Sequence, residues 1–451
     1  MIIYVLLFIS VIVSVGIRRI FFHPLSGFSG PKLAAISGWY EVYYDIIQNG
    51  GMLDHLRQLH ELYGSFTFTD IAKAKERRAI LSPLFSRRSI LKLEGFIQQS
   101  VDTFISRLLS HKEPLDLNQA IRSLSTDIIT SYCFATSFNT LDYPGFEHPM
   151  IAAQRIILKH LWIQKHFPAV FRLPSLLPRW LVLRLTPAIV ASREKRRGPL
   201  ERQIEKYMEK EEELRKAEHD TVFHHLLVHR DKSGAELSKK SLLDEAMVLL
   251  GAGSGTVTDT CVVAIANVLR TPAVREKLVE ELREAWPDRS AKFGYTALEK
   301  LPYLTAFIKE CLRCSHGIVS PLPRIVGPGK GNIAGYDVPR GAVVSASCVF
   351  LHENPDVFEN PQVFSPERWI QPHMKEVESA YLVPFSRGPR MCLGINLAWA
   401  ELYLILGNVL RKLDIALCGT LGKDDYVKYR EVFAPQWICP PLQIQVSESK
   451  A

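Results

Sequence analysis

The 451-residue sequence lacks several signals that would define other classes of protein. It has no internal repeat and no long low-complexity run, so neither a repeat architecture nor a disordered chain is indicated. No basic block is interleaved with aromatic residues, which argues against a nucleic-acid-binding surface. The formal net charge of +8 instead suits contact with a membrane surface or with an acidic protein partner.

Cysteine is sparse and scattered. Eight cysteines spread over 451 residues do not form the close spacing of a disulfide framework, so we expect a reducing compartment. Cys311 and Cys314 form a Cys-x-x-Cys pair, but no second pair follows at the spacing of a zinc site. The segment around the pair has a helical pattern, and we interpret both cysteines as structural rather than as metal ligands or a redox pair.

A nearly unbroken apolar run extends from Ile2 to Ile17 at the amino terminus, and Arg18 and Arg19 follow it. Because it has no basic segment before it and no small-residue cleavage site, it favours a retained anchor over a removed signal peptide or a buried helix. The run is at the short limit for a membrane span, and the two arginines predict a cytosolic location for the rest of the chain. We therefore divide the chain into a transmembrane anchor (1–19), a Pro/Gly-rich hinge (20–34) and one large domain (35–451).

Strand-like patterns are also few, at 341–350 and 442–446. Apolar residues at helical spacing predominate elsewhere, which predicts a mainly α protein with minor β structure. The segment 162–185, rich in aromatic residues and proline, fits either a buried loop or the border of a substrate entrance. The ranges with a helical pattern are 41–63, 89–109, 115–133, 193–217, 241–270, 304–313 and 395–415.

The most informative stretch is the decapeptide FSRGPRMCLG, which contains Cys392. A cysteine thiolate is a good metal ligand, and the helix predicted to begin after it favours negative charge at its N-terminus. Gly388 and Gly394 allow a positive φ or close contact with a flat macrocycle. Arg390 can pair with a carboxylate of that macrocycle, and Phe385 can cover the sulfur. The pattern predicts a loop that binds haem through a thiolate.

Three further residues predict a supporting cluster. Glu310 and Arg313 are three residues apart in a helical pattern, so they share one face. Arg368 follows in a Pro-Glu-Arg sequence, and the three can form a mutually satisfied buried group that holds the ligand loop. We expect the role of this group to be structural.

Three glycines interrupt the long apolar pattern of 241–270, at a cost of about 1 kcal/mol each relative to alanine. A phosphate-binding loop is excluded because no strand precedes the segment. Two explanations remain. The glycines allow close helix packing, or they form a groove over a haem in which dioxygen binds and the Thr256 hydroxyl donates a proton.

Together these motifs resemble the cytochrome P-450 superfamily, whose pattern Phe-x-x-Gly-x-Arg-x-Cys-x-Gly the decapeptide matches at every specified position. The Glu-x-x-Arg and Pro-Glu-Arg sequences precede it in the family's order. Phe22-His23-Pro24-Leu25 and Pro83-Leu84-Phe85-Ser86 make the resemblance closest to membrane-bound fungal enzymes of secondary metabolism, such as the trichodiene-oxygenase-like group.

The resemblance implies the cytochrome P-450 fold, with Cys392 as the axial ligand of haem b. It implies that Arg324 and Arg390 bind the haem propionates and that Lys75 replaces a further propionate-binding arginine. Thr256 corresponds to the oxygen-activating threonine. The acidic residue that normally precedes this threonine is replaced by Gly255, and Asp259, one helical turn further on, is a possible substitute.

The implied function is a haem-dependent monooxygenase that inserts one oxygen atom from O2 into an apolar substrate, such as a terpenoid or another secondary metabolite. The chain contains no flavin or nicotinamide domain, so the electrons would come from NADPH through NADPH–cytochrome P-450 reductase, with a cytochrome b-type protein as a further donor. The implied location is the endoplasmic reticulum membrane, with a single span and a cytosolic catalytic domain.

Two alternatives stay open. The glycine in the acidic position is compatible with a haem-thiolate isomerase or dehydratase that uses peroxide and no reductase. The chain is also roughly fifty to sixty residues shorter than expected for the family, with the gap after Gly64. The second alternative is therefore a truncated protein that binds haem poorly or is inactive.

Overall fold

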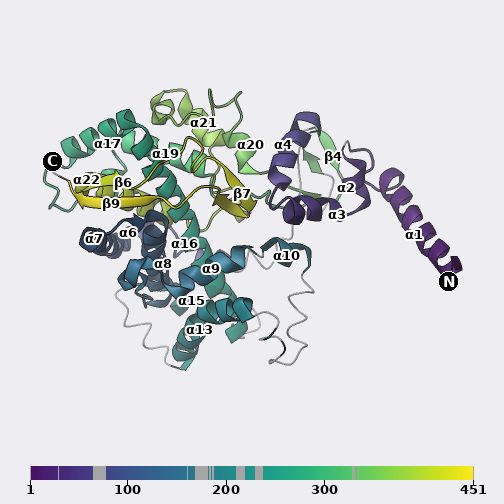
Figure 1. The fold of residues 1–451 in the computed structure, drawn as a ribbon, viewed down its shortest axis with the longest axis horizontal. Helices are drawn as coiled ribbons and strands as arrows, with labels where there is room; N and C mark the ends of the chain where they lie inside the picture. Colours follow the sequence, from purple (N-terminus) through teal and green to yellow (C-terminus); the bar gives the residue numbers. More distant parts are fainter. Residues whose placement is uncertain are drawn as a thin grey trace.

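The structure is a computed structural model that describes residues 2–28, 30–63, 78–159, 161–167, 181, 184, 187–209, 219–228, 237–327, 331–333 and 335–449. Most of these residues form one helical body, and the C-terminus lies at the end of that body far from the N-terminal helix (Figure 1). The helices of the amino-terminal half are α1 (Ile2–Phe21), α2 (Lys32–Ile36), α3 (Trp39–Val42), the π-helix η1 (Tyr43–Ile47), α4 (Met52–Tyr63), α6 (Arg87–Lys92), α7 (Glu94–Ser110), α8 (Leu117–Phe134), η2 (Thr140–Asp142), η3 (Pro144–Phe146), α9 (Pro149–Lys159), α10 (Leu161–His166), α13 (Pro187–Glu209) and α15 (Val222–Val228).

The carboxyl-terminal half adds the longest helix and the segments that carry the cysteine loop. These elements are α16 (Lys239–Arg270), α17 (Pro272–Ala285), α18 (Tyr295–Leu298), α19 (Pro302–Ser315), α20 (Cys348–His352), η5 (Pro366–Ile370), α21 (Met374–Tyr381), η6 (Gly388–Arg390) and α22 (Ile395–Lys412). The mainly helical fold class predicted from the sequence is confirmed.

Helix α16 passes through the centre of the body and packs along α8. Its first turn is capped by the Ser238 hydroxyl, which accepts a hydrogen bond from the Ser241 backbone N–H at 3.2 Å. The three glycines do not break this helix. A Cβ atom at Gly253 would lie only 2.6 Å from Cγ1 of Ile129 in α8, so glycine allows the two helices to approach closely at this point. Of the two explanations for the glycines, close packing therefore applies to Gly253.

The predicted helix over 41–63 is wrong as a single element. α3, η1 and α4 occupy this range, and the chain turns between η1 and α4 at Asn49 and Gly50, whose φ angles are 53° and 89°. A side chain at Gly50 would place its Cβ 2.5 Å from the carbonyl oxygen of Glu431. The turn thus brings the segment after the anchor against a distant hairpin.

The strands form small antiparallel sheets. The three-stranded sheet has the order β1–β9–β6, in which Ile444 of β9 pairs with Leu115 of β1 and with Leu417 of β6. The remaining pairs are β2–β5, β3–β4 and β7–β8. The bounds are β1 (Leu115–Asp116), β2 (Arg324–Ile325), β3 (Gly331–Ile333), β4 (Tyr336–Val338), β5 (Val343–Val344), β6 (Leu413–Leu417), β7 (Tyr429–Val432), β8 (Ala434–Trp437) and β9 (Gln443–Glu448).

The two strand predictions differ in outcome. The range 442–446 lies within β9 apart from its first residue, whereas 341–350 contains only the two-residue β5 before α20 begins at Cys348. The Ser347 hydroxyl accepts a hydrogen bond from the Val349 N–H at 3.2 Å and so starts a helix where alternating apolar residues had indicated a strand.

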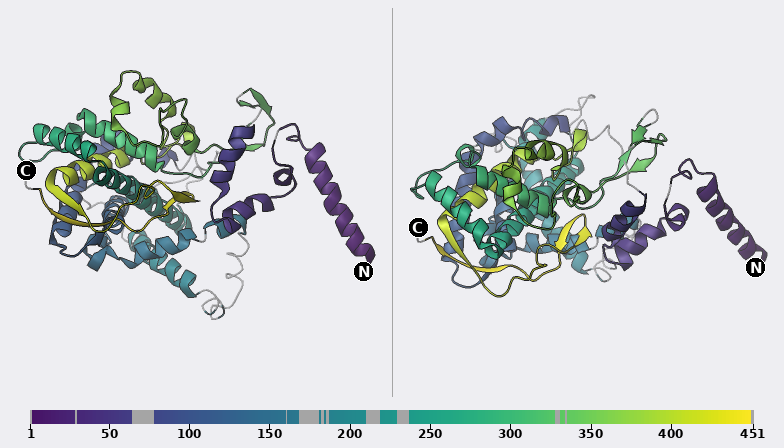
Figure 2. Two further views of the ribbon diagram at one scale, coloured as in Figure 1. Left: turned by 45° about the horizontal axis from the view of Figure 1, so that its top comes forward. Right: turned by 90° about the horizontal axis from the view of Figure 1, so that it is seen from above.

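Helix α1 projects from the body at the end opposite the C-terminus, with α2, α3 and α4 between it and the body (Figure 2). Ile3–Phe21 has a mean hydropathy of 2.1 and only 6% of its residues are buried, which fits a membrane anchor. Helix α16 is also apolar enough to span a membrane, but 61% of its apolar 18-residue window is buried inside the body, as expected for a core helix. The division of the chain at 19 and 34 stays a prediction.

Candidate functional site

The cysteine loop connects η6 to the N-terminus of α22. The backbone N–H of Cys392 donates a hydrogen bond to the Phe385 carbonyl oxygen at 2.8 Å, and that of Met391 donates to the Gly388 carbonyl at 3.0 Å. Gly388 has a φ of 75°, which permits the turn. These bonds close the loop and fix the position of the sulfur just before α22 begins.

Cys392 differs from every other cysteine of the chain because it alone is exposed. The protein surrounds the remaining sides of the sulfur, and this burial raises the pKa of the thiol. A hydrogen bond from the backbone of Gly394 and the positive charge of Arg78 act in the opposite direction. The sulfur is therefore accessible on one side and is positioned among groups that stabilise a thiolate.

Two arginines interact electrostatically near this loop. Burial and the positive charge of Arg390 both lower the pKa of Arg324, so the two guanidinium groups lie close enough to repel. Neither forms an ion pair with any residue in the described ranges, and Arg324 donates only to the neighbouring Pro323 carbonyl, at 3.1 Å. Like charges held together in this way are suited to an anionic ligand.

Arg78 was not identified from the sequence. Its Nη1 donates a hydrogen bond to the Met391 carbonyl at 2.6 Å, directly before Cys392. Lys75 lies outside the described residues.

These features fit a haem. The exposed sulfur provides an axial ligand, and Arg324 and Arg390 provide unneutralised cations for two propionates. No atom lies within 4 Å of a Cβ built at Gly388 or Gly394, which leaves room for a flat macrocycle at the loop. Phe385 packs beside Trp399, with ring centroids 6.2 Å apart, and so supports the loop from the interior.

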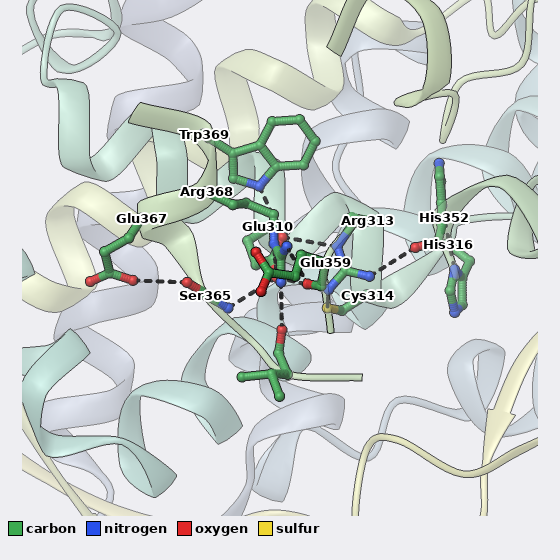
Figure 3. A network of polar contacts seen from close by, with 11 residues as sticks. Glu310, Arg313, Cys314, His316, His352, Glu359, Ser365, Glu367, Arg368 and Trp369 are labelled. Carbon is green, nitrogen blue, oxygen red and sulfur yellow. Dashed lines mark hydrogen bonds and ion pairs between the residues drawn. The ribbon is translucent and has the colours of Figure 1, made fainter. Parts of the chain in front are cut away.

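The predicted supporting cluster is present around Glu310, whose exposed fraction is 0% (Figure 3). Arg313 donates to its two carboxylate oxygens at 2.9 and 2.7 Å, and Arg368 Nε donates at 3.1 Å. The sequence did not identify two further donors, Trp369 Nε1 at 2.9 Å and the Ser365 backbone N–H at 3.0 Å. The carboxylate is thus fully hydrogen-bonded in the interior.

The electrostatics of Glu310 follow from these partners. Burial alone would raise the pKa of the carboxyl group, but the bonds and charges of Arg313 and Arg368 outweigh it and hold the pKa below its usual range. The group is therefore ionised and paired. Breaking such a buried pair is costly because an uncompensated charge is left behind.

The cluster reaches the cysteine loop through His352, which the sequence reasoning also missed. Arg313 Nη1 donates to the His352 carbonyl at 2.9 Å (Figure 3). The His352 ring in turn accepts a hydrogen bond from the Val383 backbone N–H at 3.0 Å. Val383 lies two residues before Phe385. The contact connects the buried ion pairs to the start of the loop and supports the structural role predicted for them.

Thr256 and Asp259 lie on α16 but have different partners. The Thr256 hydroxyl donates to the Ala252 carbonyl at 3.2 Å. Asp259 is 9% exposed and lies 3.6 Å from Arg122 of α8. A Cβ atom at Gly255 would lie 3.5 Å from the same guanidinium group. Asp259 is therefore paired across the α8–α16 contact.

The comparisons with known proteins agree with this geometry. A family model described as "Cytochrome P450" matches residues 48–433 of this chain. The chain belongs to the cytochrome P450 family. It is 33% identical to cytochrome P450 monooxygenase sdnE of Sordaria araneosa, over 95% of this chain and 94% of that protein. It is 31% identical to cytochrome P450 monooxygenase macH of Penicillium terrestre, over 94% of this chain and 92% of that protein.

The fold agrees as well. A crystal structure of the cytochrome P450DA heme domain superposes with a TM-score of 0.66 at 20% identity, over 83% of this chain and 77% of the other. The chain is thus a cytochrome P450 monooxygenase, and the family implies a haem-thiolate protein. The resemblance to the cytochrome P-450 superfamily that the sequence motifs indicated is confirmed.

The comparisons also bear on chain length. The alignments to macH and sdnE extend over 475 and 491 positions, although this chain has 451 residues. The relatives therefore contain residues that this chain lacks. The placement of the gap after Gly64 stays a prediction, since 64–77 lie outside the described residues.

Proposed function

We propose that Cys392 is the axial thiolate of haem b in an enzyme that hydroxylates an apolar secondary metabolite. The observation that carries this proposal is the single exposed cysteine of the chain, held in a closed loop beside two arginines that have no anionic partner among the described residues. When bound, the haem supplies the activation of dioxygen and the insertion of one oxygen atom into the substrate. The following roles concern this chain's own residues.

Arg324 and Arg390 bind the propionates and so fix the orientation of the macrocycle. Arg78 orients the loop through Met391 and its charge favours the thiolate form of Cys392. Thr256 holds a proton at its hydroxyl on the central helix, where the Ala252 carbonyl orients it. The Glu310 cluster keeps the loop in place and takes no part in the chemistry.

Electrons would come from NADPH through a separate reductase, with a cytochrome b-type donor as a further source. The exposed apolar helix α1 supports a single-pass anchor, and we propose the endoplasmic reticulum membrane with a cytosolic catalytic domain. A terpenoid substrate is proposed from the family resemblance. One relative, tryptophan 6-hydroxylase fscE of Fusarium equiseti (30% identical), has a name that gives an aromatic amino acid as substrate, so such compounds belong in the same screen.

One observation favours a second function. Gly255 provides no carboxylate next to Thr256, and Asp259 is turned to Arg122 rather than free to serve as its substitute. A haem-thiolate isomerase or dehydratase that rearranges peroxidised substrates needs no such proton supply.

The test compares two reactions of the full-length protein reconstituted with reductase in lipid. Under the proposal, product forms from an apolar substrate only when NADPH, reductase and O2 are all present. Product from a peroxidised substrate without NADPH would support the second function. Failure to take up haem at all would instead identify an inactive, truncated protein.

A further inference from the structure

A second cluster of potential ligands lies away from the cysteine loop, where η1 meets α10. It consists of Glu41, Asp45 and His166, whose ligand atoms all lie within 4.8 Å of one another. The three residues come from α3, η1 and the last position of α10, so segments more than one hundred residues apart in sequence meet here. His166 Nε2 lies 2.6 Å from Oδ2 of Asp45.

Asp45 is the buried member of the cluster, with an exposed fraction of 1%. Its Oδ2 is within hydrogen-bonding distance of Lys165 at 2.9 Å as well as of His166. Its Oδ1 is buried and has no hydrogen-bond partner in the part of the chain that the structure describes. A buried carboxylate oxygen without a partner is costly, so a bound group at this position would compensate for its desolvation.

A second buried carboxyl group lies near the cluster. Glu431 of β7 is 3% exposed, burial raises the pKa of its carboxyl group to about 7, and its Oε2 has no hydrogen-bond partner among the described residues. Electrostatic interaction with both Asp45 and Lys165 shows that it borders the cluster. Trp162 of α10 fixes the position of this strand by donating to the Glu431 carbonyl at 2.9 Å. Glu431 is therefore a neighbour of the cluster and not one of its ligands, because among the described residues only Glu41, Asp45 and His166 bring their ligand atoms within 4.8 Å of one another.

The Lys165 ammonium group marks where a cation is stable. Its Nζ lies 2.6 Å from Glu41 Oε1 and 2.9 Å from Asp45 Oδ2. The side chain is 42% exposed, so it can leave for water without crossing the core. An imidazole and two carboxylates form a donor set that suits Zn²⁺ and related divalent transition ions, and a bound ion would replace the proton that His166 Nε2 donates to Asp45.

We propose that Glu41, Asp45 and His166 form a site for a divalent transition-metal ion, which displaces Lys165 and gives the buried Asp45 carboxylate a cationic partner. The bound ion would link the segment that follows the anchor to α10. It lies outside the predicted haem site and takes no part in the haem chemistry.

The test titrates the full-length, haem-loaded protein in detergent with Zn²⁺. Isothermal titration calorimetry measures the affinity and the number of ions bound per chain. The matched variants are Lys165→Gln, which removes the competing cation, and His166→Gln, which removes a ligand and keeps a polar side chain. Lys239→Gln is the control, because it also loses a lysine paired with two carboxylates, Glu201 and Glu205, at a surface site without histidine. Haem content reports whether each variant is folded.

The proposal predicts that the wild type binds one Zn²⁺ per chain. In His166→Gln this binding should be lost, or its affinity should fall by about tenfold or more. It predicts tighter binding in Lys165→Gln and no change in Lys239→Gln. A purely structural ion-pair cluster gives the opposite pattern for Lys165→Gln, namely lower thermal stability that Zn²⁺ does not restore. Equal Zn²⁺ binding by the wild type and His166→Gln would also overturn the proposal, since the ion would then be held elsewhere.

Discussion

The Glu310 cluster and the Cys392 loop lie in neighbouring segments of the chain but differ in how their charges are satisfied. Glu310 accepts hydrogen bonds from two arginines, a tryptophan and a backbone amide, all within the protein. At the loop, by contrast, Arg324 and Arg390 repel each other without an anionic partner among the described residues, and Cys392 is exposed. A charge cluster that is complete stabilises the fold, whereas one that lacks its counterpart is arranged for a ligand. The following predictions test this distinction.

The largest effect is expected at the complete cluster. Glu310→Ala leaves the buried Arg313 guanidinium, whose side chain is 1% exposed, without its carboxylate. We expect a loss of about 3–5 kcal/mol in the free energy of unfolding and little or no haem-loaded protein. Chemical denaturation measures the loss. Glu376→Ala, at an exposed position of α21, is the control, and equal stability of the two variants would contradict a structural role for the cluster.

Loss of a charge from the incomplete cluster, formed by Arg324 and Arg390, should not lower the stability of the haem-free protein. Arg324→Ala removes one of two repelling cations, so the haem-free protein should be at least as stable as the wild type. Haem binding should weaken roughly tenfold, because a charge-assisted hydrogen bond to a propionate is lost. Haem titration followed by absorbance measures the affinity, with exposed Arg340→Ala as the control. A less stable haem-free protein with unchanged haem affinity would place Arg324 among the structural residues.

A smaller effect is expected at Thr256, which contributes to proton supply and not to haem binding. Thr256→Ala should keep its haem spectrum and NADPH consumption but release more hydrogen peroxide at the expense of product. The ratio of product to NADPH consumed measures this coupling. Unchanged coupling would indicate that protons reach the site of oxygen activation without the Thr256 hydroxyl.

The smallest effect is expected at another buried glutamate, Glu401. Glu401 of α22 is 1% exposed, and its Oε2 has no hydrogen-bond partner, so burial raises the pKa of this carboxyl group well above its usual range. It is protonated in the folded state while the unfolded chain ionises above a pH of about 4.3. The stability of the wild type should therefore fall as the pH rises above that value.

Glu401→Gln replaces the neutral acid with a neutral amide of similar shape and removes this contribution. The variant should match the wild type near pH 4 and exceed it in free energy of unfolding near pH 8. Urea denaturation at both pH values measures the difference, with exposed Glu113→Gln as the control. A stability difference that does not change with pH would show that Glu401 is ionised in the folded protein, as Glu310 is.

Local sequence patterns predicted the parts of the site that lie close together in the chain. The spacing of Glu310 and Arg313 on one helical face, and the spacing of glycines and arginine around Cys392, require no knowledge of distant contacts. Arg78 and His352 could not be found in this way. Arg78 donates to the backbone carbonyl of Met391, and His352 accepts from the backbone N–H of Val383. Both bonds join segments that are distant in the sequence, and such bonds produce no periodic pattern.

The same limit applies to the fold. The long helix α16 was predicted to end at Arg270, where the structure ends it, because Thr271-Pro272 is a local signal. The turn at Gly50 was missed, since the reason for glycine there is the close approach of Glu431 from the other end of the chain. Asp259 likewise was a possible neighbour of Thr256 by spacing alone, but its pairing with Arg122 depends on how α8 packs.

The measurement that tests the central claim most directly is the carbon monoxide difference spectrum of the reduced protein, recorded for the wild type, Cys392→Ser and Cys348→Ser. Cys348 is the matched control because it is a partly buried cysteine whose Sγ contacts the His316 and Ile318 carbonyls. The account predicts the long-wavelength Soret band of a thiolate complex in the wild type and in Cys348→Ser, and its loss in Cys392→Ser. A Cys392→Ser protein that keeps this band would show that another sulfur holds the iron.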